Sequence, residues 1–311
     1  MRTLITHSGS FHPDDVFSAA VLTLLFRKRG EDINIVRTRD LDVIKKGDVV
    51  FDVGGEYNPA KNRFDHHQVG GAGERDNGIP FAAFGLVWKQ YGTEVAGSRE
   101  AALEIDTKLV APIDCTDNGF KAPQPLHDDV YPYCLENVIF VFHPTWKEVA
   151  EGYEDKAFYS LVPLAVSILE REIIKMVDKQ DAVAHLERCY AETDGKRLLT
   201  LDKEYPWKDF ADVHPDILFV IYPDGVRGVW GVSAARKTKH EFVNRKDLPK
   251  AWGGLRDGAF AAASGVPDAV FCHNKLFFAV AKSREGAIAL AQKALEYREY
   301  KNSISAQPVD T

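Results

Sequence analysis

The sequence predicts an α/β protein with a mainly parallel sheet in its N-terminal half and a smaller mixed α/β domain at its C-terminus. Short apolar runs alternate with helical patterns along the first half, and polar turn residues end each run. Beyond about residue 195 strand-like runs become frequent, which indicates a second domain. A chain of 311 residues is long enough for both. We expect a first domain over 1–195, which includes a helical connector, and a second domain over 196–311.

Periodicity predicts the elements of the first domain. Short apolar runs predict strands, and apolar residues three and four positions apart predict helices. Carboxylates at the start of the first helix, Asp14 and Asp15, suit the positive end of its dipole. Residues 111–119 have the composition of a turn, and residues 120–135 hold three prolines, which predicts a loop. The expected elements are strands at 3–6, 33–36 and 48–53, and helices at 16–25, 81–91, 100–110 and 159–188.

In the second domain, strand-like runs come first and a helical pattern comes last. Its clearest element is an amphipathic helix at 284–297, and the apolar runs before it predict strands at 213–222, 226–232 and 276–281. We therefore expect strands and a helix packed together in a mixed α/β arrangement.

Composition excludes several classes of protein. With 45% hydrophobic and 27% charged residues the chain is typical of a globular protein, and no apolar run is long enough to span a membrane. The net charge of −7 argues against a generally basic nucleic-acid coat, although it allows a local basic groove. The four cysteines include no CxxC pair, so neither a zinc knuckle nor a disulfide scaffold is expected. We see no signal peptide and expect a cytoplasmic protein.

Histidine and aspartate residues follow several of these runs. His7 ends the first run, Asp52 ends a buried one, and His66 comes shortly after Phe64. In open α/β sheets ligands bind outside the carboxyl ends of the strands, so these side chains should converge. We expect one metal-dependent hydrolytic site built from His7, His12, Asp14, Asp52, Asp65, His66, His67 and Asp117.

The ligand types define the kind of metal site. Imidazole and carboxylate without thiolate favour Mn²⁺, Zn²⁺, Fe²⁺ or Co²⁺ over Ca²⁺ or a structural zinc. Six potential ligands suit two ions that share one carboxylate. Asp52 is the candidate for that bridge, because it is the lone carboxylate at the end of a buried strand. Taken singly, most of these residues are also common in turns and helix caps, and only the pair His66-His67 behind Asp65 is unusual by itself.

Longer motifs resemble a known family. The triplet Asp65-His66-His67, preceded by Asp52 and by a His/Asp cluster, is similar to the DHH phosphoesterase superfamily. Within it, four segments resemble the MYG family, called "metal-dependent protein hydrolase". These segments are THSGSFHPDD at 6–15, VGGEYNP at 53–59, FDHHQ at 64–68 and WGGLRD at 252–257.

The resemblance implies an N-terminal DHH-type domain that holds two divalent metal ions, usually Mn²⁺, with Mg²⁺, Zn²⁺ or Fe²⁺ as alternatives. The implied reaction is phosphodiester hydrolysis by a water that the two metals activate, in a 3′–5′ exonuclease acting on single-stranded RNA or short oligonucleotides. The implied ligands are His7, His12, Asp14, Asp52, His66 and Asp117, while Asp65 and His67 orient the site and meet the phosphate.

One position departs from the superfamily pattern. Its first motif is typically His-x-x-x-Asp-x-Asp, and His12 stands where the first of these aspartates is expected. Imidazole in place of carboxylate lowers the negative charge at that metal, which favours ions that prefer histidine. Whether Asp15 or Asp114 also ligates stays open at this stage.

The resemblance also implies a C-terminal domain that binds the substrate. Where superfamily members often have Gly-Gly-Gly-His, this chain has Gly253 and Gly254 followed by Arg256. Glycines allow close approach of the backbone to a phosphate, and arginine binds phosphate in a bidentate way. His273 is the fourth candidate for substrate binding. A turn with a surface arginine and an edge histidine is the alternative.

Two other functions remain open. The acidic chain is also compatible with a hydrolase of small phosphate compounds, such as a nucleotide or a phosphoanhydride, and with a metal-binding protein that has no catalytic role. A protease is not supported, because neither a His-Glu-x-x-His helix nor a nucleophile elbow is present. The sequence is compatible with a homo-oligomer.

Overall fold

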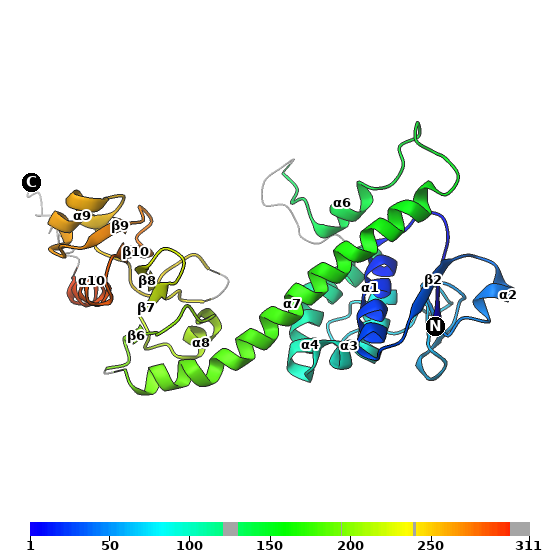
Figure 1. The fold of residues 1–311 in the computed structure, drawn as a ribbon, viewed down its shortest axis with the longest axis horizontal. Coiled ribbons are helices and arrows are strands. Elements are labelled where there is room, and N and C mark those ends of the chain that lie inside the picture. The colour runs from blue at the N-terminus through cyan, green and yellow to red at the C-terminus, as the bar shows by residue number, and fades with distance from the viewer. Residues whose placement is uncertain (121–129, 194, 239–240, 299–311) are drawn as a thin grey trace, which may run out of the picture. The chain divides into compact units, whose positions relative to one another are not determined.

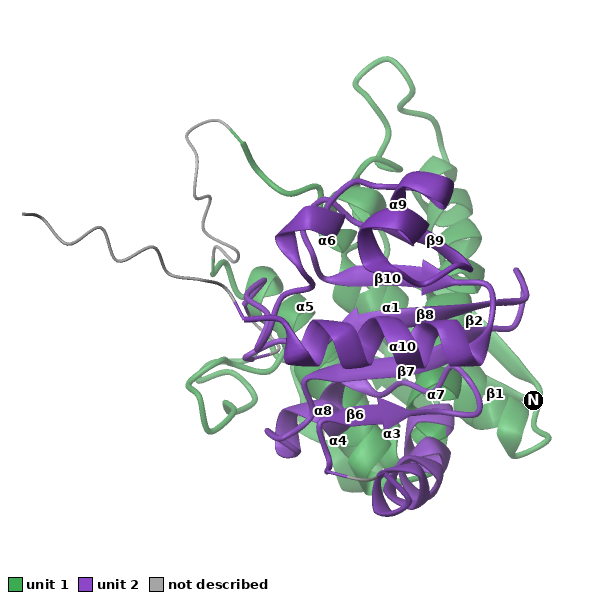
Figure 2. Cartoon of the chain, turned by 90° about the vertical axis from the view of Figure 1, so that its left-hand side faces the viewer, with its two compact units in different colours: residues 1–177 green, residues 178–311 purple. Residues whose placement is uncertain are grey.

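The computed structural model describes residues 1–120, 130–193, 195–238 and 241–298 (Figure 1). The chain divides into two compact units, Met1–Val177 and Asp178–Thr311, which Figure 2 shows in separate colours. Each unit holds one five-stranded sheet. The predicted α/β class with two domains is therefore confirmed.

The first sheet has the strand order β2-β1-β3-β5-β4. The pairs β1/β2, β1/β3 and β3/β5 are parallel, and only β4 pairs with β5 in the antiparallel sense. The order reverses beside β1, because β2 lies on one side of it and β3 on the other. Such a switch point opens a crevice at the carboxyl ends of the strands. The strands are β1 (Arg2–Thr6), β2 (Ile33–Arg37), β3 (Val49–Phe51), β4 (Tyr57–Asn58) and β5 (Arg63–Phe64).

Helices cover both faces of this sheet. Side chains alternate along β1 and β3, so Leu4 and Phe51 join a large core on one face, whereas Ile5 and Val50 pack with α2 on the other. Figure 1 shows α1, α3 and α4 on the side of α7, with α2 beyond β2. The helices are α1 (Pro13–Lys28), α2 (Leu41–Ile44), α3 (Ala83–Ala96), α4 (Arg99–Ile105), α5 (Ala111–Asp117), α6 (Leu135–Phe140) and α7 (Tyr153–Ala191).

Two segments differ from the sequence prediction. Residues 111–117 form the helix α5 rather than a turn, because a π-helical turn over Asp106–Val110 carries the chain directly from α4 into it. In the second unit, the strand expected at 213–222 is β7 at Phe219–Asp224, and Val213 instead ends the helix α8. Pro215 follows closely and cannot donate to a ladder. Residues 121–129 of the predicted loop lie outside the described residues.

Helix α7 runs through the division between the units. Its first turns pack Phe158 and Leu169 into the core of the first unit, and its last turns pack Leu186 into the second. For this reason the chain divides between 177 and 178, within the helical connector, whereas the sequence prediction ended the first domain at residue 195. In the part of the chain that the structure describes, no helix is both long and apolar enough to cross a membrane.

The sheet of the second unit has the strand order β6-β7-β8-β10-β9 and is mainly antiparallel. Figure 2 shows α10 lying along this sheet, where its alanine-rich face packs against β7, β8 and β10. The elements are β6 (Leu198–Thr200), α8 (Lys208–Val213), β7 (Phe219–Asp224), β8 (Val229–Ala234), α9 (Asp257–Ser264), β9 (Ala269–Cys272), β10 (Phe278–Ala281) and α10 (Arg284–Glu296).

Candidate metal centre

Three parallel strands deliver side chains to one edge of the first sheet. His7 directly follows β1, Asp52 directly follows β3, and His66 comes two residues after β5. Asp52 has a φ of 55°, which lies in the left-handed region that side chains other than glycine rarely adopt. Backbone strain of this kind concentrates at functional sites, where the surrounding structure must hold it.

The start of α1 supplies the next group. Asp14 and Asp15 are fully buried at the N-terminal end of this helix, where its dipole favours negative charge. One oxygen of Asp15 accepts a hydrogen bond from the backbone N–H of His12 at 2.9 Å. Its other oxygen lies 3.3 Å from Nε2 of His7. Asp15 therefore both caps the helix and reaches the site.

Asp52 lies at the centre of the cluster. Its Oδ2 is 3.0 Å from Nε2 of His7, and its Oδ1 is 3.3 Å from Nε2 of His66. Nδ1 of His67 is 3.5 Å from the same Oδ1. Asp52 is also only 2% exposed. A buried carboxylate between three imidazoles suits the bridging position expected from the sequence.

Asp117 reaches the cluster from the last residue of α5, not from a turn after a strand. Its Oδ2 lies 3.4 Å from Nε2 of His66, which also lies 3.7 Å from Oδ2 of Asp14. Helix α5 is anchored at this end by Asn118, whose side-chain amide donates to the carbonyls of Pro80 and Asp114.

The donor atoms form overlapping groups. In each group the ligand atoms all lie within 4.8 Å of one another, and Asp52 and His12 each belong to two groups. This overlap is the arrangement that two ions with shared ligands require. The groups are His7, His12 and Asp52; Asp52, His66 and His67; and His12, Asp14 and Asp117.

Several potential ligand atoms of the cluster are buried without a hydrogen-bond partner, and a bound cation fits such a site. Both oxygens of Asp52, Oδ1 of Asp14, Oδ2 of Asp15 and Nε2 of His66 are buried and form no hydrogen bond. Leaving such groups unpaired is costly, and buried polar atoms in proteins almost always have partners. Divalent cations that accept both nitrogen and oxygen ligands would satisfy all of them.

The electrostatics of the cluster favour the same conclusion. Burial raises the pKa of Asp15 to about 7, and burial together with the charge of Asp52 raises the pKa of Asp14 well above its ordinary value. Burial also acts to raise the pKa of Asp52, but His66 and His7 beside it hold that pKa below the ordinary value. Without a cation the cluster therefore tends to keep protons, which a bound cation would displace.

Asp65 and His67 lie beside the cluster of candidate metal ligands. Oδ1 of Asp65 accepts hydrogen bonds from the backbone N–H of His66 at 2.8 Å and from Nδ1 of His67 at 2.8 Å. Its Oδ2 accepts from the N–H of Gly55 at 2.6 Å. Asp65 thus positions both histidines, while the side chain of His67 remains 60% exposed.

Sequence reasoning missed Arg39. This residue comes two positions after β2, its Nε donates to the carbonyl of Ser8 at 3.0 Å, and its Nη2 lies 3.3 Å from Nδ1 of His7. The side chain is exposed at the rim of the cluster. Because β2 is parallel to β1, the same strand-end argument that identified His7 also identifies Arg39.

Asp114 does not join the cluster. Its oxygens accept hydrogen bonds from Arg75 and from the N–H of Gly85 at 2.9 Å. Arg75 also pairs with Asp106 at 2.9 Å. These contacts fasten the glycine-rich segment after His67 to α5 and to the π-helical turn before it.

The four predicted substrate-binding residues lie together in the second unit, around β9. The N–H of Gly254 donates to the carbonyl of Cys272, and the guanidinium of Arg256 lies 4.5 Å from the ring centre of Phe271. His273 follows β9, and its Nδ1 accepts from the N–H of Lys275 at 3.0 Å. The N–H of Gly253 donates to the carbonyl of Lys250. Both glycine amides are thus used within the fold, which leaves Arg256 and His273 as the groups that can meet a ligand.

Comparison with known proteins gives relatives along almost the whole chain. The human "MYG1 exonuclease" is 28% identical, over 96% of this chain and 87% of its own length. A Caenorhabditis elegans MYG1 protein is 31% identical, over 96% of this chain and 97% of its own length. The crystal structure of RecJ with Mn²⁺ from Thermus thermophilus aligns with 12% identity and a TM-score of 0.29. That alignment covers 96% of this chain, which spans about half of the RecJ chain (52%).

The family match agrees with the motifs. A family described as an uncharacterised protein family (UPF0160), the MYG1 exonuclease group, matches residues 3–295. This range includes all the residues of the cluster and those around β9. The chain therefore belongs to the MYG1 family, as the four sequence motifs predicted.

Proposed function

We propose that this protein is a metal-dependent phosphodiesterase, a 3′–5′ exonuclease that shortens single-stranded RNA or short oligonucleotides. The observation that carries the proposal is the buried carboxylate of Asp52 between His7 and His66, with unpaired donor atoms around it. The name exonuclease carried by the human and rat relatives supports a nuclease rather than another hydrolase.

Six residues would hold two divalent cations, and Mn²⁺ suits their mixed donors best. They are His7, His12, Asp14, Asp52, His66 and Asp117. When bound, such cations lower the pKa of a water and stabilise charge on the phosphate oxygens. Asp15 fixes the start of α1, so that Asp14 and His12 keep their places.

Three other residues would orient the reaction. Asp65 accepts a hydrogen bond from Nδ1 of His67 and raises the pKa of that ring, and the protonated ring carries a second N–H, at Nε2, that can donate to a phosphate oxygen of the substrate. Arg39 offers further donors at the rim, where a phosphate entering the cluster would meet it. In the second unit, Arg256 and His273 are proposed to hold the substrate. Gly253 and Gly254 shape the backbone beside them.

A second candidate is a hydrolase of small phosphate compounds. The net charge of −7 favours it, because an acidic surface repels long polyanions.

We further propose that the protein works in the cytoplasm, since its four cysteines are all unpaired and suit a reducing compartment.

The test uses purified full-length protein with Mn²⁺ and separate substrates. RNA labelled at its 5′ end should give a ladder of stepwise shorter products, whereas a 3′ label should be released first as a mononucleotide. His66→Ala should abolish the activity, while His185→Ala, an exposed histidine far along α7, should not. Cleavage of pyrophosphate or nucleotides alone would favour the second candidate. Inactivity with every metal and substrate would contradict both.

A further inference from the structure

We propose that one end of the second sheet is a binding surface for single-stranded nucleic acid. This basic rim consists of Arg236, Lys237, Phe242, Lys275 and Phe277. It rests on the proposed function, to which it adds a surface that binds the single-stranded substrate. None of these five residues belongs to the candidate metal centre or to the four residues around β9 named above.

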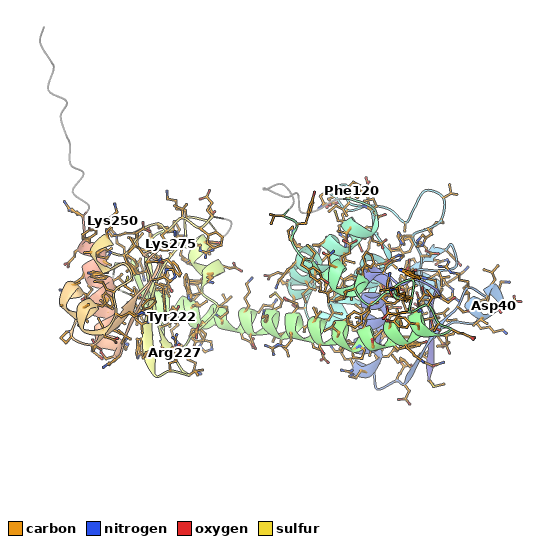
Figure 3. All side chains as sticks on the ribbon, turned by 90° about the horizontal axis from the view of Figure 1, so that it is seen from above. Asp40, Phe120, Tyr222, Arg227, Lys250 and Lys275 are labelled. Atoms are coloured by element: carbon orange, nitrogen blue, oxygen red, sulfur yellow. The ribbon has the colours of Figure 1, made fainter. Side chains whose placement is uncertain are left out.

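The sheet brings the rim together from separate segments. Strands β8 and β10 are antiparallel, with Ser233 opposite Phe278, and the N–H of Ala234 donates to the carbonyl of Phe277. Residues just after β8 and just before β10 therefore lie at the same end of the sheet. Figure 3 shows Lys275 on the same side of the second unit as Lys250.

Two described segments after β8, at 236–237 and 243–244, pair with each other beside this end. The N–H of Lys237 donates to the carbonyl of Val243 at 2.8 Å, and Arg236 forms a bridge with Asn244. The result places the guanidinium of Arg236 4.3 Å from the ring centre of Phe242. A cation and an aromatic ring are thereby held side by side at the surface.

The charge of the rim contrasts with that of the chain. Arg236, Lys237 and Lys275 have no carboxylate partner among the residues that the structure describes, although the whole chain has a net charge of −7. Arg245, which lies in the same stretch of sequence, is not part of the rim. Its guanidinium donates to the carbonyls of Ala211, His214 and Ile217 and so has a structural role. Cations without carboxylate partners, gathered at one end of the second sheet, favour an anionic ligand.

The exposed aromatic residues indicate a ligand whose flat rings have free faces for stacking. Phe242 is 88% exposed and Phe277 is 41% exposed, and the ring of Phe277 lies 4.4 Å from that of His273. Aromatic side chains between cations are the surface on which single strands bind, because bases stack on the rings while phosphates meet the cations. A duplex keeps the faces of its bases stacked inside, so it offers phosphates and base edges but no free face for an aromatic ring. We therefore infer a single strand rather than a duplex.

The experiment measures binding without turnover. In the presence of a chelator, fluorescence anisotropy measures binding of the full-length protein to a labelled 12-nucleotide oligouridylate. The unlabelled RNA duplex of the same length and vesicles containing phosphatidylserine are then tested as competitors for the labelled strand. Phe242→Ala should weaken oligouridylate binding roughly 5- to 100-fold. Lys275→Ala should reduce the slope of log affinity against log salt by about 0.7. Arg227→Ala is the control for a surface cation outside the rim, because Arg227 pairs with Asp224 in the turn between β7 and β8, at the other end of these strands (Figure 3).

Several outcomes would overturn the inference. Equal losses in Arg227→Ala and Lys275→Ala, unchanged binding in Phe242→Ala, or duplex or vesicle binding as tight as that of the single strand would each do so. Thermal unfolding of each variant shows that the comparison concerns folded protein. Because the measurement needs no hydrolysis, intact binding without any nuclease activity would contradict the proposed function and leave the basic rim supported.

Discussion

The buried carboxylates predict an unusual response of stability to pH and metal. The perturbation is to strip the protein with chelator, measure its unfolding between pH 5 and pH 8, and then add Mn²⁺. Burial raises the pKa of Asp15 from 3.8 to about 7. The folded protein thus binds a proton that the unfolded chain has released, and stability falls as the pH rises from about 4 to about 7.

The size of the stability loss follows from the shift in the pKa of Asp15. About two pKa units of the Asp15 shift lie between pH 5 and pH 7, and each corresponds to 1.36 kcal/mol, so stripped protein should lose about 2–3 kcal/mol. The raised pKa values of Asp14 and His7 act in the same direction and add to this loss, whereas the lowered pKa of His12 opposes it near neutral pH. In a unit of this size the loss lowers the melting temperature by about 5–10 °C.

Added Mn²⁺ should offset most of this loss at pH 8. At about 100 times its dissociation constant, a bound ion returns about 2.7 kcal/mol at pH 8, and protons compete with it at pH 5. Differential scanning fluorimetry measures both effects. Asp52→Asn should lose most of the Mn²⁺ response, while Asp42→Asn, whose side chain is 83% exposed, should keep it. Stripped protein that is more stable at pH 8 than at pH 5, or an equal Mn²⁺ shift at both, would refute the reasoning.

Three further experiments test other parts of the first unit. Arg75→Met should cost about 3–5 kcal/mol in urea unfolding, because it leaves Asp114 buried without its cation, and Asp114→Asn in the same chain should recover part of the loss. Gly85→Ala should destabilise the protein by about 1–3 kcal/mol, since a Cβ there would overlap an oxygen of the buried Asp114 side chain; an unchanged melting temperature would contradict this placement. Arg39→Gln should lower kcat/KM roughly tenfold or more at saturating Mn²⁺, as expected for one lost charged hydrogen bond to phosphate; an unchanged kcat/KM would contradict this role.

The chemistry of the candidate centre was predictable from the sequence because it depends on residue type and local order. His7, Asp52 and His66 each follow an apolar run, and these runs became three parallel strands with their carboxyl ends at one edge. Asp65 beside His67 likewise forms the contact expected from its position. The period of each run was enough to predict which elements form, although the end of a strand such as β7 depends on the neighbours with which it pairs.

Tertiary structure decided the rest. Asp117 reaches His66 from a helix, because a π-helical turn joins two segments that look separate in the sequence. Packing also gives different roles to the basic residues that follow β8. The guanidinium of Arg245 donates to backbone carbonyls, whereas that of Arg236 lies beside Phe242 at the surface. Sequence alone thus determined which donor atoms the protein has and which strand ends present them. Which of those atoms are buried, paired or free to bind depends on contacts between residues far apart in the chain, and no local pattern specifies these.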